Sequence, residues 1–264
     1  MHESRRYRIG QIVPSSNTTM ETEVPTILHA RERLYPERFT FHSSRMRMHR
    51  VTTEELARMN VEGERCAAEL ADARVDVMST ACLVALMAMG PGYHLRAEAA
   101  MAEQVRAGGS EAAVMTSAGA LLEGLSILKA RRISLLAPYT KDLTRLVVKY
   151  IEDAGVEVVD AINFDISDNL EVGRRDPLRL LDDVMNLKTG NVDAVVLSVC
   201  VQMPSLPAVQ IAQDRLGLPV TSTAICTARG MLNRLGLQGR VPGFGSLMSA
   251  ESRESANAPR GVYS

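Results

Sequence analysis

Two cysteines follow apolar, β-branched runs, and a thiol is among the strongest nucleophiles that a side chain can supply. Cys82 follows VDVMSTA at residues 75–81, and Cys200 follows DAVVLSV at residues 193–199. Each is expected where a strand gives way to a helix or its approach, and ligands of parallel sheets bind beyond the carboxyl ends of the strands. The helix dipole at such a position lowers a thiol pKa. We therefore expect two activated thiols.

The backbone around these cysteines is expected to bind anions. The first N–H groups of a helix lack partners within the helix and can receive a carboxylate. On this basis the amides of Leu83, Val84 and Val201 are candidates for contacts with a substrate carboxylate.

Polar side chains gather at another pair of expected strand ends. They are Ser15, Ser16, Asn17, Thr18 and Thr19 in the first half of the chain, and Tyr139 and Thr140 in the second. They could form the rim of a ligand site. Helix capping explains Ser16 or Thr18 equally well, and a residue at a helix start can serve both purposes.

The elements that must position these residues alternate between strand and helix, which is typical of a parallel sheet with crossover helices. The expected strands are 7–13, 38–45, 75–80, 112–117, 132–138, 156–162, 193–199 and 219–223. The expected helices are 18–34, 53–73, 92–107, 118–128, 141–154, 177–187, 204–216 and 224–235. The pattern predicts an α/β fold.

Three strand-to-helix corners recur in the same order along the chain. Residues 8–21 align with 132–145, 70–84 with 187–202, and 114–125 with 220–231. The repeat predicts two lobes related by a pseudo-twofold axis, each with a parallel sheet flanked by helices, and an active site in the cleft between them. We expect the first lobe at 1–120, with a possible return of the C-terminal segment, the second at 121–248, and a flexible tail at 249–264.

Composition restricts the partners of the chain. With 30 Lys+Arg and 31 Asp+Glu in 264 residues, the net charge of −1 gives no general attraction for nucleic acid or an anionic membrane. No secretory signal or membrane-spanning segment is expected, so the cytoplasm is the predicted location. The five histidines show no metal-ligand spacing, and no metal site is predicted. The basic segment RMRMHR at 45–50 is expected to be a solvated loop, or less readily a lid or subunit contact.

The four cysteines are too few and too far apart for a disulfide framework. Cys66 is expected within a helix as buried packing, and Cys226 at the start of another helix in the same role.

The paired cysteines, the PSSNTTME segment with Asn17, the PY corner with Tyr139 and the DNLEVGR segment with Asn169 resemble one known group. The chain resembles the aspartate/glutamate racemase superfamily over residues 5–248, and within it the maleate cis-trans isomerase family. The resemblance implies a cofactor-independent isomerisation of maleate to fumarate through a covalent adduct. It also implies a homo-oligomer and a place in the breakdown of pyridine-ring compounds.

The resemblance assigns roles to five side chains. Cys82 matches the nucleophile that adds to the double bond of maleate. Cys200 matches the cysteine that gives a proton to the neighbouring carbon, or holds that side of the intermediate, and takes the proton back on elimination. Asn17, Tyr139 and Asn169 match the side chains that hydrogen-bond the two carboxylates.

Three alternatives remain open from the sequence. An aspartate or glutamate racemase would use both cysteines as acid and base at one carbon. An arylmalonate-type decarboxylase has only the second cysteine, so Cys82 argues against it. A non-catalytic binding protein for a small diacid would have no reason to hold thiols of low pKa, and alkylation no faster than that of free cysteine would favour it.

Overall fold

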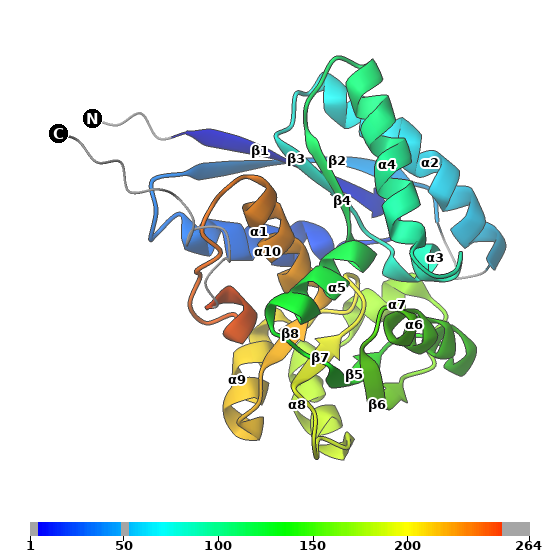
Figure 1. Ribbon diagram of the computed structural model, residues 1–264, viewed down its shortest axis with the longest axis vertical. Coiled ribbons are helices and arrows are strands. Elements are labelled where there is room, and N and C mark those ends of the chain that lie inside the picture. Colours follow the sequence, from blue (N-terminus) through cyan, green and yellow to red (C-terminus); the bar gives the residue numbers. More distant parts are fainter. Residues whose placement is uncertain (1–4, 49–52, 250–264) are drawn as a thin grey trace.

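Two four-stranded parallel sheets form the frame of this computed structural model, which describes residues 5–48 and 53–249 (Figure 1). The first sheet has the order β2-β1-β3-β4 and the second the order β6-β5-β7-β8. The strands are β1 (Arg6–Pro14), β2 (Arg38–Met46), β3 (Val77–Thr80), β4 (Ala113–Thr116), β5 (Arg132–Ala137), β6 (Glu157–Asn163), β7 (Ala194–Ser198) and β8 (Val220–Ser222).

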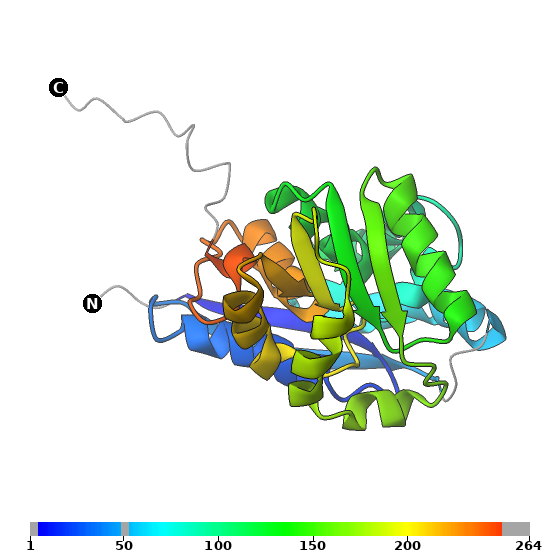
Figure 2. The ribbon, with the colours of Figure 1, turned by 90° about the horizontal axis from the view of Figure 1, so that it is seen from below.

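Helices follow the strands in the alternation that the sequence predicts. The α-helices are α1 (Met20–Arg31), α2 (Thr53–Asp72), α3 (Leu83–Met87), α4 (Tyr93–Ala107), α5 (Ser117–Ile127), α6 (Lys141–Asp153), α7 (Asn169–Arg174), α8 (Leu180–Asp183), α9 (Leu206–Leu216) and α10 (Thr223–Arg234). Short 3-10 helices are η1 (Pro177–Arg179), η2 (Val184–Asn186) and η3 (Ser246–Met248). Figure 2 shows α6 beside the second sheet.

The sequence repeat and the sheet order agree strand by strand. The repeat pairs β1 with β5, β3 with β7 and β4 with β8, and each pair holds the same place in its own sheet. The central strands β3 and β7 are buried along their whole length, as expected when helices cover both faces of a parallel sheet. The expectation of two related α/β lobes is therefore confirmed.

The helices α5 and α10 pack together where the lobes meet. After β8 the chain returns toward the first lobe, and α10 packs on α1 and β3 as well as on α5. Gly124 of α5 makes this approach possible, because a Cβ there would lie 2.6 Å from Sγ of Cys226. The division of the chain at residue 120 stays a prediction, and Ala120 lies inside α5.

Several boundaries differ from the prediction. The expected helix at 177–187 is a broken series of η1, α8 and η2, while α3 and α7 are short helices absent from the expected set. The tail at 249–264 lies outside the described residues except for Ser249. Across 5–48 and 53–249, no helix is both long and apolar enough to cross a bilayer.

Candidate active site

Cys82 lies at a strained corner between β3 and α3. Its backbone has φ 70° and ψ 60°, the left-handed region that side-chain-bearing residues seldom occupy. Such strain costs about 1–3 kcal/mol and persists where the surrounding structure fixes it, often at functional sites. The backbone N–H of Ala85, in the first turn of α3, donates a hydrogen bond to the thiol.

Cys200 lies in a turn after β7 rather than at the start of a helix, since α9 begins only at Leu206. The Ser198 hydroxyl fixes this turn by donating to the Cys200 carbonyl at 2.8 Å and accepting from the Cys200 N–H at 3.3 Å. The N–H of Gln202 approaches Sγ of Cys200 at 3.4 Å. The Met203 N–H and the Tyr139 hydroxyl also donate to this sulfur.

The structure brings Cys82, Cys200 and Tyr139 together in the interior between the two lobes. The two thiols are 9% and 8% exposed. Burial is the largest cause of the raised pKa of both Cys82 and the Tyr139 phenol; charge on Cys200 raises the pKa of Cys82 further, and charge on both cysteines does the same for Tyr139, so the three groups lie close together. The sequence repeat therefore predicted correctly that the two strand-end cysteines approach each other.

The expected activation of both thiols by a helix dipole is wrong. Burial, the largest cause, raises the pKa of Cys82 to about 12, and burial also raises the pKa of Cys200. The loss of hydration outweighs the few N–H donors, and α3 has only five residues with which to build a dipole. Both cysteines are neutral thiols at pH 7. An enzyme with neutral thiols would also be alkylated slowly at its cysteines, so slow alkylation does not distinguish a binding protein from an enzyme.

The two asparagines come from opposite lobes and meet at Ser16. The Asn169 side-chain amide, at the start of α7, donates to the Ser16 hydroxyl at 2.8 Å. The N-cap residue of α1 is Thr19, so neither Ser16 nor Thr18 caps this helix. The Asn17 carboxamide oxygen accepts from the N–H groups of Thr19 and Met20, at 3.0 and 3.1 Å, at the start of α1. Within the described part of the chain, Nδ2 of Asn17 makes no hydrogen bond and remains a donor for a ligand.

Sequence reasoning missed Gln202. Its side chain, buried in the turn of Cys200, hydrogen-bonds the backbone at Thr18, Thr19, Ser16 and Asn169. The only signal in the sequence was a polar residue within the apolar run VVLSVCVQM.

The candidate backbone donors divide into two groups. The amides of Leu83 and Val84 open α3 and have no hydrogen-bond partner among the residues the structure describes, as the first turn of a helix normally leaves them. Val201 lies in the turn of Cys200. In this turn the amides that donate to the Cys200 sulfur are those of Gln202 and Met203, rather than that of Val201.

Part of the basic segment at 45–50 has a structural role. Arg45 pairs with Glu21 and donates to the carbonyls of Ser15 and Asn17, each at 3.1 Å, so it fixes the turn that carries Asn17. Arg45 and Met46 belong to β2 rather than to a loop. Residues 49 and 50 of this segment lie outside the described residues.

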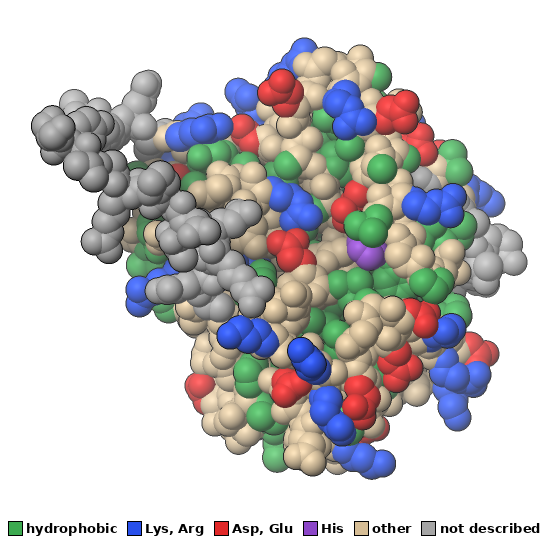
Figure 3. Space-filling view, in the orientation of Figure 1, with side chains coloured by type: hydrophobic (Ala, Val, Ile, Leu, Met, Phe, Trp, Pro, Cys, Tyr) green, Lys and Arg blue, Asp and Glu red, His purple; other side chains and the backbone are tan. Residues whose placement is uncertain are grey.

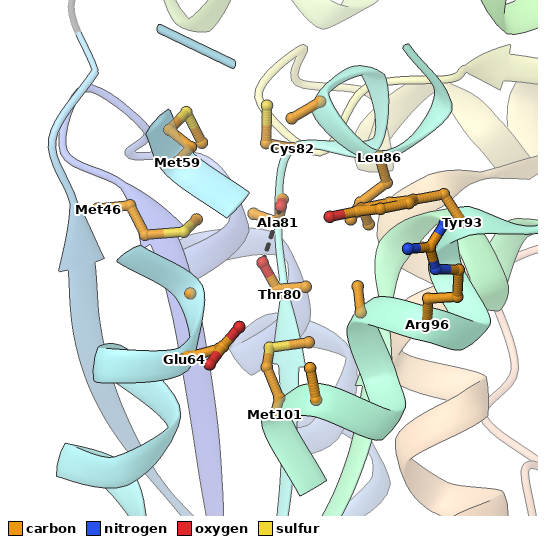
Figure 4. A pocket seen from close by; sticks show the side chains of 14 residues that line it. Met46, Met59, Glu64, Thr80, Ala81, Cys82, Leu86, Tyr93, Arg96 and Met101 are labelled. Atoms are coloured by element: carbon orange, nitrogen blue, oxygen red, sulfur yellow. Dashed lines mark hydrogen bonds between the residues drawn. The ribbon is translucent and has the colours of Figure 1, made fainter. Parts of the chain in front are cut away.

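A pocket of about 250 Å³, whose lining includes Cys82, lies between α2 and α4 (Figure 4). Met46, Met59 and Met101 line it together with Glu64 and Arg96. The Cys82 sulfur points away from Glu64 and Met101, so the reactive atom does not face the middle of this pocket.

No group of three or more His, Cys, Asp or Glu side chains that could hold a metal ion occurs among the described residues. The chemistry available at this site is that of two thiols, one phenol, two carboxamides and backbone amides. Neutral donors of this kind suit a small dicarboxylate whose negative charge grows during reaction.

Comparison with known proteins shows which families this chain is similar to. Residues 9–248 match the family model for arylmalonate decarboxylase. A maleate isomerase from Geobacillus stearothermophilus is 56% identical over 94% of this chain and 99% of its own, and one from Alcaligenes faecalis is 54% identical over 93% and 97%.

Solved structures show the same likeness. A maleate isomerase from Pseudomonas putida S16, crystallised with maleate as a cysteine-to-alanine variant, has a TM-score of 0.92 at 51% identity, covering 93% of this chain and 98% of that one. A cysteine-to-serine variant of the maleate cis-trans isomerase from Nocardia farcinica, with a covalently bound succinylcysteine intermediate, has a TM-score of 0.88 at 47% identity, covering 92% and 98%.

Proposed function

The chain belongs to the maleate isomerase family, and we propose that Cys82 and Cys200 are the two groups with which it converts maleate to fumarate. The observation that carries this assignment is the approach of two buried thiols from the equivalent strand ends of both lobes. Addition of sulfur replaces the double bond of maleate by a single bond, about which the molecule can rotate.

In the proposed cycle, the sulfur of Cys82 bonds to one alkene carbon, and the electron pair of the double bond moves toward the carboxylate on the other side. Cys200 delivers a proton to the second carbon, and the proton lost from Cys82 replaces it on Cys200. After rotation Cys200 gives the proton that it holds to the departing sulfur of Cys82 and takes back the proton from the second carbon, so the C–S bond breaks and fumarate forms. Both thiols regain their protons, so the cycle is balanced without an oxidant or reductant.

The donors around Cys200 suit an acid and base. The Tyr139 hydroxyl and the amides of Gln202 and Met203 all stabilise its thiolate form, whereas Cys82 has the single donor Ala85. Cys200 can therefore carry negative charge briefly, between giving its proton to the substrate and receiving the proton from Cys82. Cys82 is left as the group that forms and breaks the C–S bond.

The substrate carboxylates are proposed to bind the neutral donors around the thiols. Asn17 offers its free Nδ2, Leu83 and Val84 offer unpartnered amides, and Asn169 lies across the same turn. Tyr139 and the amide of Val201 remain candidates for the second carboxylate. One carboxylate must stay bound while the other moves during rotation about the single bond. We therefore propose that the site binds one carboxylate more tightly than the other.

Further features of the proposed function come from chemistry and from the resemblance. The cycle is redox-neutral and thiol-driven, so we propose that it needs no cofactor, and we place the enzyme in the cytoplasm in the breakdown of pyridine-ring compounds. A homo-oligomer is also proposed. Association of subunits is supported by the exposed apolar residues Met89, Leu95 and Leu146, which are 48%, 62% and 43% exposed. Figure 3 also shows hydrophobic side chains (green) around the histidine (purple) on this face of the molecule.

Proton NMR tests the function directly. Purified, reduced protein is mixed with maleate without added cofactor, beside the variants Cys82→Ala and Cys200→Ala. We expect fumarate from the parent protein and almost none from either variant.

Other outcomes would identify the alternatives. Deuterium entering Cα of aspartate or glutamate in D₂O, without fumarate from maleate, would indicate a racemase. Tight binding of maleate with neither reaction would indicate a binding protein.

A further inference from the structure

Gln202 has every hydrogen-bonding group of its side chain occupied. Its Oε1 accepts from the N–H groups of Thr18 and Thr19 at 3.0 and 3.3 Å. Its Nε2 donates to the carbonyls of Ser16 and Asn169 at 3.1 and 2.8 Å. A carboxamide has two acceptor sites and two donors, so all four are used, and the residue is 2% exposed.

These four bonds join the three segments that carry the site. Gln202 itself lies two residues after Cys200, and its own N–H approaches that sulfur at 3.4 Å. Its Oε1 holds the start of α1, directly after Asn17, and its Nε2 holds the first residue of α7, Asn169. One side chain therefore links the turn of the proton donor to both candidate carboxylate ligands.

The surroundings are shaped to fit this side chain. A Cβ at Gly173 of α7 would lie 2.4 Å from Nε2 of Gln202, so only glycine leaves room for the carboxamide there. The other end of the turn is also anchored across the lobes, because Glu23 of α1 accepts from the amides of Ser205 and Leu206, each at 2.6 Å. The segment between Cys200 and α9 is thus held at both ends.

We propose that Gln202 is a positioning residue that fixes Asn17 and Asn169 relative to Cys200, so that the carboxylate ligands and the proton donor face the same substrate. This inference rests on the proposed function for the identity of the substrate. It adds a residue that touches neither the reacting atoms nor the carboxylates through its side chain.

The test compares Gln202→Leu with Gln213→Leu. Gln213 is a matched control because its carboxamide also joins separate segments, accepting from Ser246 N and Oγ at 2.7 and 2.8 Å and from Val220 N at 3.3 Å, away from both cysteines. Both variants should lose thermal stability. Only Gln202→Leu should lose kcat/KM for maleate, by about 10²-fold, the effect of a displacement near 1 Å at a reacting centre.

A second variant supplies a readout that a purely structural role would not give. Gln202→Glu keeps an acceptor for Thr18 and Thr19 but sets a carboxylate oxygen against the carbonyls of Ser16 and Asn169. Protonation of this carboxyl restores one donor. The kcat/KM of Gln202→Glu relative to the parent should therefore rise as the pH falls from about 8 to about 6, with no such change for Gln213→Leu. If Gln202→Leu fails to fold, the Gln202→Glu variant still tests the positioning role.

Binding of succinate, a saturated dicarboxylate that cannot isomerise, separates this inference from the proposed function. Calorimetry should show weaker binding by Gln202→Leu and Gln202→Glu than by the parent protein and Gln213→Leu, whether or not fumarate forms. Parent-like kcat/KM and succinate affinity in folded Gln202 variants would overturn the positioning role. Failure of the parent to bind any dicarboxylate would overturn both proposals.

Discussion

At the scale of single residues, the sequence predicted which side chains meet but not their protonation. Cys82, Cys200 and Tyr139 could be placed from strand ends and from a repeat, because the carboxyl end of a strand is a fixed place in a parallel sheet. A pKa depends instead on burial and donors, which form only when the lobes close. For this reason the expected activated thiols are neutral ones, with the pKa of Cys82 raised to about 12.

Removal of the Tyr139 hydroxyl should slow the reaction. The phenol donates to Cys200 and lowers the pKa of that thiol, so Tyr139→Phe raises it further and destabilises the thiolate that forms during turnover. We expect kcat/KM to fall by about 10²-fold. Tyr150→Phe is the control, since Tyr150 is also buried but bonds His94. Equal kinetics for the Tyr139→Phe and Tyr150→Phe variants would exclude the assigned role.

The pH dependence follows from the raised thiol pKa of Cys82. Because that pKa is raised to about 12, the fraction of neutral thiol in the free enzyme is constant between about pH 7 and about pH 9. A cycle that begins from neutral thiols should then have a nearly flat kcat/KM over this range, as measured by NMR initial rates. A rise of about tenfold per pH unit would show instead that a pre-formed thiolate is required.

At the scale of elements, long periodic segments were predictable and short ones were not. The strands β1, β5 and β7 lie within about a residue of their predicted bounds. The helices α3 and α7 have five and six residues, too few for a periodic pattern, and the first residue of α7 is hydrogen-bonded by the distant Gln202. The contact of α5 with α10 likewise depends on shape that no local pattern reveals.

Gly124→Ala should destabilise the α5–α10 contact. Alanine gains about 1 kcal/mol in helix propensity, but overpacking costs about 1–3 kcal/mol. A Cβ only 2.6 Å from Sγ of Cys226 favours the upper end of that range. Urea denaturation should show a net loss of stability, partly recovered by adding Cys226→Ala. Gly190→Ala is the control, because a Cβ there meets no atom within 4 Å. Unchanged or increased stability of Gly124→Ala would contradict this packing.

At the scale of the whole molecule, two similar lobes close around thiols that are shielded from water. The duplication was visible in the sequence because each half repeats the same strand-to-helix corners. The links across the lobes were not visible, since Gln202 and Glu23 act through distant backbone groups. Packing of the two lobes against each other buries the thiols. Because buried thiols have a raised pKa, the stability of the protein depends on pH.

Alkaline pH should destabilise the protein through its buried thiols. The pKa of Cys226 rises from 9.0 to about 12, so above pH 9 the unfolded chain releases a proton that the folded protein retains. Stability therefore falls as pH rises from about 9 to about 12. Between about pH 8 and about pH 10.5, urea denaturation should show a loss smaller by about 2 kcal/mol in Cys226→Ala than in the parent. An equal loss in both proteins would contradict the raised pKa.

Covalent capture of the substrate on Cys82 tests the central claim most directly. Intact-mass spectrometry of Cys200→Ser mixed with maleate should show a gain equal to one maleic acid, and peptide mapping should place it on Cys82. The matched Cys82→Ser variant should show no adduct on Cys200 or on any other cysteine. Rapid conversion of maleate to fumarate by the Cys82→Ser variant, or an adduct found on Cys200 in that variant, would contradict the assignment of Cys82 as the nucleophile.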